Sequence, residues 1–78
     1  MIKLGKYRHF KGEMYEVLGV AKHSETLEEY VVYRALYDNK LSKLWIRPLV
    51  MFQQTVTLPD GTKIPRFTYI GNLQGSTL

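Results

Sequence analysis

The sequence predicts an all-β fold: a small, SH3-like, partly open barrel of about five strands with one short helical turn. β-Branched and aromatic residues recur with a period of two in several short segments, whereas helical periodicity is scarce. Turn signals separate these segments at intervals of about 8–12 residues, which is typical of barrels and sandwiches. A chain of 78 residues has room for one core only. An α+β arrangement with one short helix is the alternative.

Three strands are expected in the first half of the chain. The first covers residues 6–10, the second residues 14–23 and the third residues 30–37, each with β-branched or aromatic residues. Gly19 lies in the middle of the longest strand, where a glycine is typical of the bulge or bend that lets a small barrel turn a corner. The polar segment 24–29 is expected to connect the second and third strands.

A short fourth strand and a helical turn are expected next. Residues 44–47 form the predicted strand, and Pro48 is expected to end it because proline has no N–H to donate to a sheet ladder. Residues 49–53 are expected to wind one tight helical turn.

The last predicted element is a hairpin. Residues 55–58 and 66–70 flank the sequence Pro-Asp-Gly-Thr at 59–62, in which proline presets φ and glycine accepts a positive φ. We therefore expect a single domain over residues 1–70. Residues 71–78 contain glycine and serine without periodicity and are expected to form a frayed tail.

Large apolar side chains on the inner faces of these elements form the predicted core. Its members are Tyr15, Val17, Val20, Val32, Leu36, Ile46, Leu49, Phe52, Val56 and Phe67. The 6 tyrosines, 3 phenylalanines and 1 tryptophan of the chain exceed what one small core hides completely. Core packing is expected for most of these rings, and the surplus is a candidate lining for a groove that stacks bases or grips a peptide.

The absence of cysteine limits both the compartment and the chemistry. Without cysteine there is neither a disulfide framework nor a thiolate zinc site, which favours a reducing, intracellular environment. The N-terminus lacks the apolar run of a signal peptide, and no apolar stretch is long enough to span a bilayer. A soluble, cytoplasmic protein with no membrane partner is expected.

The net charge is +4, from 11 Lys and Arg against 7 Asp and Glu. Such a mildly basic balance suits the binding of nucleic acid or of an anionic small ligand. It also lies within the range that an ordinary soluble domain carries for solubility. Charge alone leaves both interpretations open.

Several long motifs follow one another along the chain. They are G-x-Y-R-H-F-K-G at 5–12, H-S-E-T at 23–26, V-V-Y-x-x-L-Y at 31–37 and W-x-R-P at 45–48. Together with Met51-Phe52 and Pro65-Arg66-Phe67, they resemble the motifs of a family of small bacterial domains of unknown function, over roughly residues 5–70. The resemblance implies a compact bacterial domain with no established activity.

Six charged residues within or directly beside predicted strands form the candidate ligand-binding surface. They are Arg8, His9, His23, Glu25, Arg47 and Arg66. A charged group in a strand must find a partner or reach a cleft, because an unpaired buried charge costs several kcal/mol. Guanidinium groups that converge would grip a phosphate or carboxylate in a shared anion pocket. A structural network, in which each arginine pairs with a carboxylate or a carbonyl, is the alternative.

His23 and Glu25 are central to this hypothesis, because they follow the longest predicted strand where it enters a polar loop. In extended geometry, a spacing of two residues would put both side chains on one side of the chain. They would then act as base and orienter, or as acid and base. The alternative is a turn that Ser24 and Thr26 close by side-chain-to-backbone hydrogen bonds.

A metal site is not expected. His9, His23 and Glu25 would be its three ligands, but the chain has only 2 histidines, no cysteine and no His pair at i, i+4 on a helix. Neither a nucleophile elbow nor a phosphate-cradling glycine-rich loop is present, and no cofactor is expected.

Two functional hypotheses follow. The first is a binding module whose arginine and aromatic surface takes a nucleic acid, a nucleotide or a peptide. The second is a small enzyme, or a subunit of one, that uses His23, Glu25 and an arginine cluster on an anionic substrate. Convergence of His9, His23, Glu25 and two arginines in one concave pocket would favour the enzyme. An open face of arginine and aromatic groups would favour the binding module. The sequence itself favours the binding module, because it contains no catalytic signature. The sequence leaves the oligomeric state open.

Overall fold

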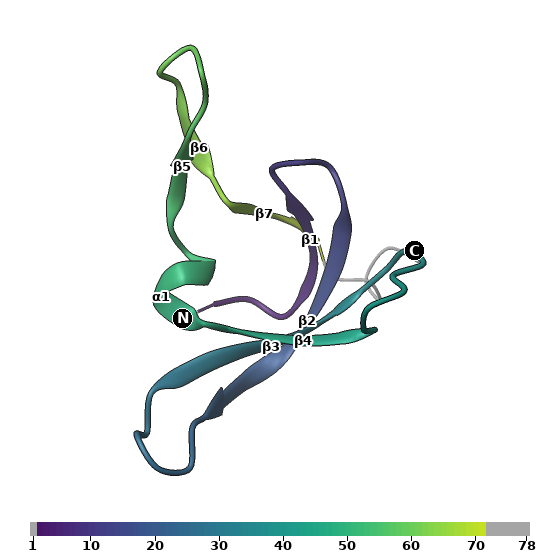
Figure 1. Cartoon of the computed structure of the whole chain (residues 1–78), viewed down its shortest axis with the longest axis vertical. Helices are drawn as coiled ribbons and strands as arrows, with labels where there is room; N and C mark the ends of the chain where they lie inside the picture. Colours follow the sequence, from purple (N-terminus) through teal and green to yellow (C-terminus); the bar gives the residue numbers. More distant parts are fainter. Residues whose placement is uncertain (1, 72–78) are drawn as a thin grey trace.

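Residues 2–71 are described by the structure, a computed structural model, and they form seven strands and one short helical turn (Figure 1). These elements are β1 (Gly5–His9), β2 (Met14–Lys22), β3 (Glu29–Ala35), β4 (Leu44–Pro48), α1 (Leu49–Phe52), β5 (Thr55–Thr57), β6 (Lys63–Pro65) and β7 (Phe67–Gly71). The predicted all-β class with one helical turn is confirmed. Apart from Gly71, the tail predicted at residues 71–78 lies outside the described residues.

The described strands form two antiparallel sheets. The main sheet has the order β4-β3-β2-β1-β7, and β5 and β6 form a separate two-stranded ladder. The main sheet curls strongly, with α1 beside its concave side, while β5 and β6 stand away from it (Figure 1). Its edge strands β4 and β7 do not pair with each other within residues 2–71, so the barrel is partly open, as predicted.

Gly19 marks a bulge in β2, as predicted. The register between β2 and β3 shifts between Val17 and Gly19, so β2 carries an extra residue there. The shift puts Val20 opposite Val31 on the inner face, yet Val20 is 41% exposed. The outer part of the β2–β3 hairpin projects beyond the body of the domain, away from the other described strands (Figure 1). The prediction that Val20 belongs to the core is therefore wrong.

β3 presents to the core the opposite face from the one predicted. Its buried residues are Val31, Tyr33 and Ala35. Val32 lies opposite Ile46, which is 63% exposed. Leu36 and Val56, also predicted in the core, are only partly buried and lie outside the core cluster. Because this strand carries apolar side chains on both faces, its pairing with β2 decides which face turns inward.

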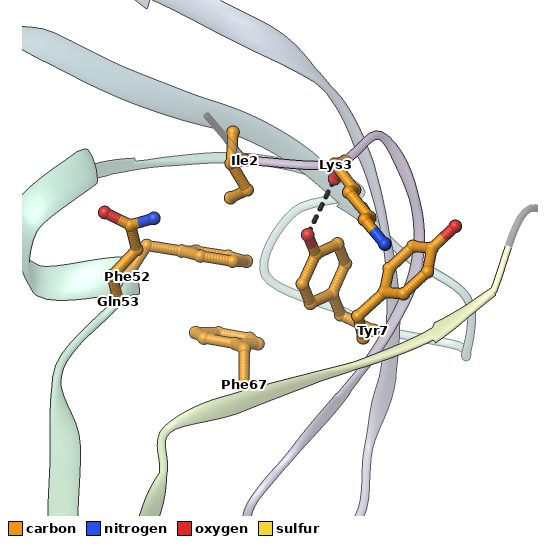
Figure 2. A pocket seen from close by; sticks show the side chains of 7 residues that line it. Ile2, Lys3, Tyr7, Phe52, Gln53 and Phe67 are labelled. Carbon is orange, nitrogen blue, oxygen red and sulfur yellow. Dashed lines mark hydrogen bonds between the residues drawn. The ribbon is translucent and has the colours of Figure 1, made fainter.

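The core is an aromatic cluster with aliphatic neighbours. Its buried members are Tyr7, Val17, Val31, Tyr33, Phe52 and Phe67. The rings of Phe52 and Phe67 stack with their centroids 4.0 Å apart and their planes 4° from parallel (Figure 2). The predicted core positions of Val17, Phe52 and Phe67 are confirmed, and Tyr15 and Leu49 pack against the cluster from partly buried positions.

Pro48 ends β4, as predicted. Because β4 is an edge strand of the main sheet, the missing N–H of proline leaves no central ladder incomplete. Its φ of −51° suits the start of the helical turn that follows and brings Phe52 into the core. In the described part of the chain, no helix is long and apolar enough to cross a membrane.

The predicted pairing of the last hairpin is wrong. β5 pairs with β6, a strand that was not predicted, and β7 pairs with β1 instead. The turn has the expected chemistry, with φ at +89° for Gly61 and the Asp60 carboxylate accepting from the Thr62 N–H at 2.9 Å. The Arg66 N–H then donates to the Gln54 carbonyl at 2.9 Å, which closes the base of the ladder. The chain therefore leaves the ladder at Arg66 and enters the main sheet directly afterwards.

Candidate functional site

Three of the six predicted site residues lie within electrostatic reach of one another. They are His9, Arg47 and Arg66, and together they are called the His9 cluster. His9 ends β1 and lies opposite Phe67 of β7, with the two ring centroids 4.9 Å apart. The guanidinium carbon of Arg47 lies 5.8 Å from the centroid of the same phenylalanine ring. Phe67 thus supports two members of the cluster with one buried ring.

Arg47 reaches the cluster from the edge strand β4. It lies opposite Val31, whose buried side chain shows that this position faces the concave side. Its Nε donates a hydrogen bond of 3.3 Å to the hydroxyl of Tyr33. This bond anchors the base of the guanidinium group while the terminal nitrogens remain available as donors.

Arg66 joins the cluster from the junction between β6 and β7. Its carbonyl accepts from the Phe10 N–H at 2.9 Å, which ties this junction to the end of β1. Its Nε is buried and has no hydrogen-bond partner within residues 2–71. Buried polar groups in folded proteins are nearly always bonded, so this donor points to a partner such as an ion or a water molecule.

Burial and the neighbouring charges together set the protonation of His9. Burial lowers the pKa of His9 below its ordinary value of 6.5, and Arg47, Arg66 and Lys11 lower it further. The carboxylate of Glu13, 3.9 Å from Nδ1, acts in the opposite direction. Nδ1 accepts from the Lys11 N–H at 3.2 Å, so the neutral ring carries its proton on Nε2. His9 therefore offers one N–H donor next to two guanidinium groups.

Carboxylate partners are scarce around these arginines. Between described residues, Arg34 forms an ion pair with Glu16, and Glu13 lies 3.9 Å from His9, with which it forms an ion pair only when the ring is protonated. Neither Arg47 nor Arg66 has a carboxylate within ion-pair distance in that part of the chain. Two like charges held near each other without a counter-ion favour the binding of an anion.

A tyrosine network borders the cluster on the concave face. The hydroxyls of Tyr15 and Tyr37 lie 2.8 Å apart, and the side-chain amide of Asn39 donates to Tyr37 at 3.1 Å. Burial and the hydrogen bond to Tyr37 raise the pKa of Tyr15, so its hydroxyl stays neutral. The ring of Tyr15 lies 6.4 Å from that of His9. The wall of Tyr15 and Tyr37 is therefore aromatic and uncharged, and the Glu13 carboxylate is the charged group near both Tyr15 and His9.

His23 and Glu25 lie at the other end of β2, in the exposed turn between β2 and β3 (Figure 1). The Nδ1 atom of His23 accepts from the backbone N–H groups of Glu25 and Thr26, at 3.2 and 3.3 Å. The Thr26 hydroxyl accepts from the N–H of Glu28 at 3.2 Å. Side-chain-to-backbone bonds thus close this turn, with His23 in the role that the sequence assigned to Ser24.

Arg8 lies apart from both groups. It is exposed on β1, between the inward-facing side chains of Tyr7 and His9, so alternation along the strand turns it to the outer face. The structure therefore brings together His9, Arg47 and Arg66, and it separates them from Arg8 and from the turn that holds His23.

Comparison with known proteins places this architecture in a family. The family model described as "Protein of unknown function (DUF1653)" matches residues 5–69. The chain belongs to the DUF1653 family. A crystal structure of a DUF1653 protein from Bordetella bronchiseptica is 39% identical and superposes with a TM-score of 0.85, covering 92% of this chain and 91% of that one. No curated protein sequence gives a significant match.

Several residues at the site of this DUF1653 domain were not predicted. Lys11 and Glu13 flank His9 through the β1–β2 turn, and Asn39 completes the tyrosine network. The proximity of Lys11 and Glu13 to His9 in the sequence was a usable signal, because a tight turn returns them to the strand end. Asn39 gave no such signal. Among residues 2–71, no three His, Cys, Asp or Glu side chains come together as a metal site requires.

Proposed function

We propose that this DUF1653 domain is a binding module that recognises an anionic ligand, namely a nucleic acid, a nucleotide or an acidic peptide, through the His9 cluster. One observation carries the proposal. Arg47 and Arg66 lie near His9 beside an uncharged aromatic wall, and neither has a carboxylate partner among the described residues. A phosphate or carboxylate at this cluster would accept from the guanidinium groups and from His9 Nε2, and it would offset their mutual repulsion.

The way in which the three groups are held supports binding without a large rearrangement. Arg47 is anchored to Tyr33, the backbone of Arg66 is bonded to Gln54 and Phe10, and His9 is packed against Phe67. Donors that are fixed before binding lose little conformational freedom when the ligand arrives. Nearby partly buried rings would add contacts to planar or apolar parts of the same ligand.

The enzyme hypothesis depended on a different arrangement. It required His23 and Glu25 to converge with His9 and two arginines, whereas His23 and Glu25 lie in an exposed turn at the far end of β2. The proximity of His9, Arg47 and Arg66 supports the binding module. The enzyme hypothesis has no comparable geometric support.

Titration with three probes tests the proposal. A fluorescein-labelled oligothymidylate, ADP and a labelled oligoglutamate peptide are titrated at low and moderate salt, by anisotropy for the labelled probes and calorimetry for ADP. We expect Arg66→Gln to weaken binding of the probe about ten- to hundredfold, because a hydrogen bond to a charged group contributes roughly 1.5–3 kcal/mol. Arg8→Gln removes the same charge from the outer face and is the matched control. Equal weakening by both variants, or no saturable binding of any probe, would contradict the proposal.

A further inference from the structure

The edge strand β4 exposes aliphatic side chains on the outer face of the main sheet. Leu44 is 55% exposed and Ile46 is 63% exposed. Both lie on the outer face, because Trp45 between them is opposite the buried Tyr33. Within residues 2–71, β4 pairs with β3 alone. An exposed apolar edge strand is a template for pairing with another chain, which makes this edge a candidate interface.

Pairing with β3 decides which backbone groups of β4 face the free edge. The Ala35 N–H donates to the Lys43 carbonyl at 2.9 Å. Because bonding alternates along an antiparallel ladder, every second residue from Lys43 onwards also points its backbone groups towards β3. The residues that point their backbone groups away from the sheet are therefore Leu44, Ile46 and Pro48.

Two of these three residues are already satisfied within the chain. The Ser42 hydroxyl accepts from the Leu44 N–H at 3.2 Å and donates to the Leu44 carbonyl at 2.7 Å. Pro48 has no N–H, and its carbonyl accepts the first bond of α1, of which it is the N-cap residue. Within residues 2–71, Ile46 is therefore the residue of β4 whose N–H and carbonyl are both free at the edge.

We propose that a second copy of this chain pairs with β4 in an antiparallel register that places Ile46 on the two-fold axis. The two Ile46 residues then exchange both backbone hydrogen bonds. Leu44 lies opposite the partner's Pro48, and neither residue needs a further bond. An unrelated extended peptide would instead place free N–H and C=O groups opposite Leu44 and Pro48, where no backbone group is available to pair with them. The edge therefore matches a second copy of itself better than an arbitrary peptide.

The side chains of β4 favour the same register. Trp45 lies opposite the partner's Arg47, in the kind of pair whose side chains approach most closely, and a guanidinium group beside an indole ring is favourable. An axis one residue earlier, at Trp45, would place Lys43 opposite the partner's Arg47, and these two cations repel each other. Since Arg47 belongs to the His9 cluster, the partner contributes its Trp45 to the surroundings of that cluster. The interface goes beyond the proposed function, because it stands whether or not the cluster binds an anion.

Sedimentation equilibrium over a wide range of protein concentration tests the proposal. We expect a weak dimer, because one bonded residue pair and a few side chains hold it together. Ile46→Lys is expected to raise the dissociation constant about tenfold or more, because it places like charges opposite each other on the axis. Ile70→Lys adds the same charge at an exposed position of the other edge strand, β7, and is expected to leave the dimer unchanged. Wild-type protein that stays monomeric at every concentration, or equal weakening by both variants, would overturn the proposal.

Disulfide cross-linking tests the register, because the chain has no cysteine of its own. Residues that exchange both bonds across an antiparallel pair have Cα atoms about 5.5 Å apart, which is within the reach of a disulfide. Ile46→Cys is therefore expected to give a covalent dimer on mild oxidation. Leu44→Cys would lie about 14 Å from its counterpart and is expected to give no covalent dimer. Equal cross-linking of the two variants would overturn the register.

Discussion

The two histidines of this domain make the same local bond in different surroundings. Each lies directly after or at the end of a strand, and the Nδ1 of each accepts from a backbone N–H two residues later, at 3.2 Å. The side chain of His9 is only 14% exposed and packs on Phe67, with arginines nearby. His23 is exposed and has Tyr30 as its ring neighbour, at 6.2 Å.

This difference shows that the hydrogen bonds of a turn do not by themselves bring charged side chains together as a candidate binding site. Both histidines close a turn, but only His9 lies where a buried ring and two arginines from distant segments also arrive. Local hydrogen bonds fix the direction of a side chain, and packing against other elements fixes what lies around it. The contrast between the His9 end and the His23 end of the β1–β2–β3 meander leads to four predictions.

The largest effect is expected from removing the ring beneath His9. Phe67→Ala deletes a side chain that is 7% exposed and stacks on Phe52, and it should lower the free energy of unfolding by about 3–5 kcal/mol. Tyr30→Ala, at the His23 end, should lower it by about 1 kcal/mol. Urea denaturation followed by circular dichroism measures both. A Phe67→Ala protein with a wild-type midpoint would show that the inner face is assigned wrongly.

Truncating each histidine gives the second contrast. His9→Ala removes a ring packed against Phe10 and Phe67 and should lower stability by about 1–2 kcal/mol. His23→Ala removes two exposed bonds to backbone N–H groups and should cost about 0.5 kcal/mol. Thermal unfolding of the two variants under identical conditions provides the comparison. Equal losses would mean that packing on Phe67 contributes nothing to stability.

A dependence on pH should mark the His9 end. Because the pKa of His9 is lower in the folded state than its ordinary value of 6.5, the unfolded chain binds the proton more readily. The stability that the neutral ring contributes is therefore complete above pH 6.5 and is lost as the pH falls towards the lowered pKa of the folded state. Melting temperatures across this range should fall less steeply in His9→Gln than in wild type. Parallel curves would contradict the assigned shift.

The smallest effect is expected at Glu25. Its carboxylate takes no part in the bonds that close the turn, since its contact with His23 runs through its backbone N–H. Glu25→Gln should therefore change the free energy of unfolding by less than about 0.5 kcal/mol. The same variant should leave binding of the anionic probes unchanged, as measured in the titrations above. Lost binding with intact stability would restore the turn as part of the functional surface.

Features that depend on local chemistry were predictable from the sequence. The bulge at Gly19, the end of β4 at Pro48 and the turn around Gly61 each follow from a property of one residue type. The inward face of β3 was not predictable, because Val31 and Val32 offer equivalent apolar groups and the register with β2 chooses between them.

Long-range pairing explains what was missed in the second half and at the site. The sequence of residues 63–70 does not indicate that β6 pairs with β5 and β7 with β1. The pairing of β7 depends on a strand that is far away in the sequence. The proximity of His9, Arg47 and Arg66 depends on the same pairing. All three residues were among the six candidates predicted from the sequence, but only the strand topology shows that these three lie near one another.

Under the proposed function, the position of Arg66 makes ligand affinity depend on how often the β5–β6 ladder opens. Arg66 is held where that ladder closes on Gln54, and the ladder stands away from the main sheet (Figure 1). An isolated two-stranded ladder is only marginally stable, so its base opens more often than the sheet does. While the base of the ladder is open, Arg66 is displaced from the His9 cluster, and a ligand that needs Arg66 does not bind. The apparent dissociation constant then rises in inverse proportion to the closed fraction, and the turn at Gly61, far from any ligand, becomes a means of tuning affinity.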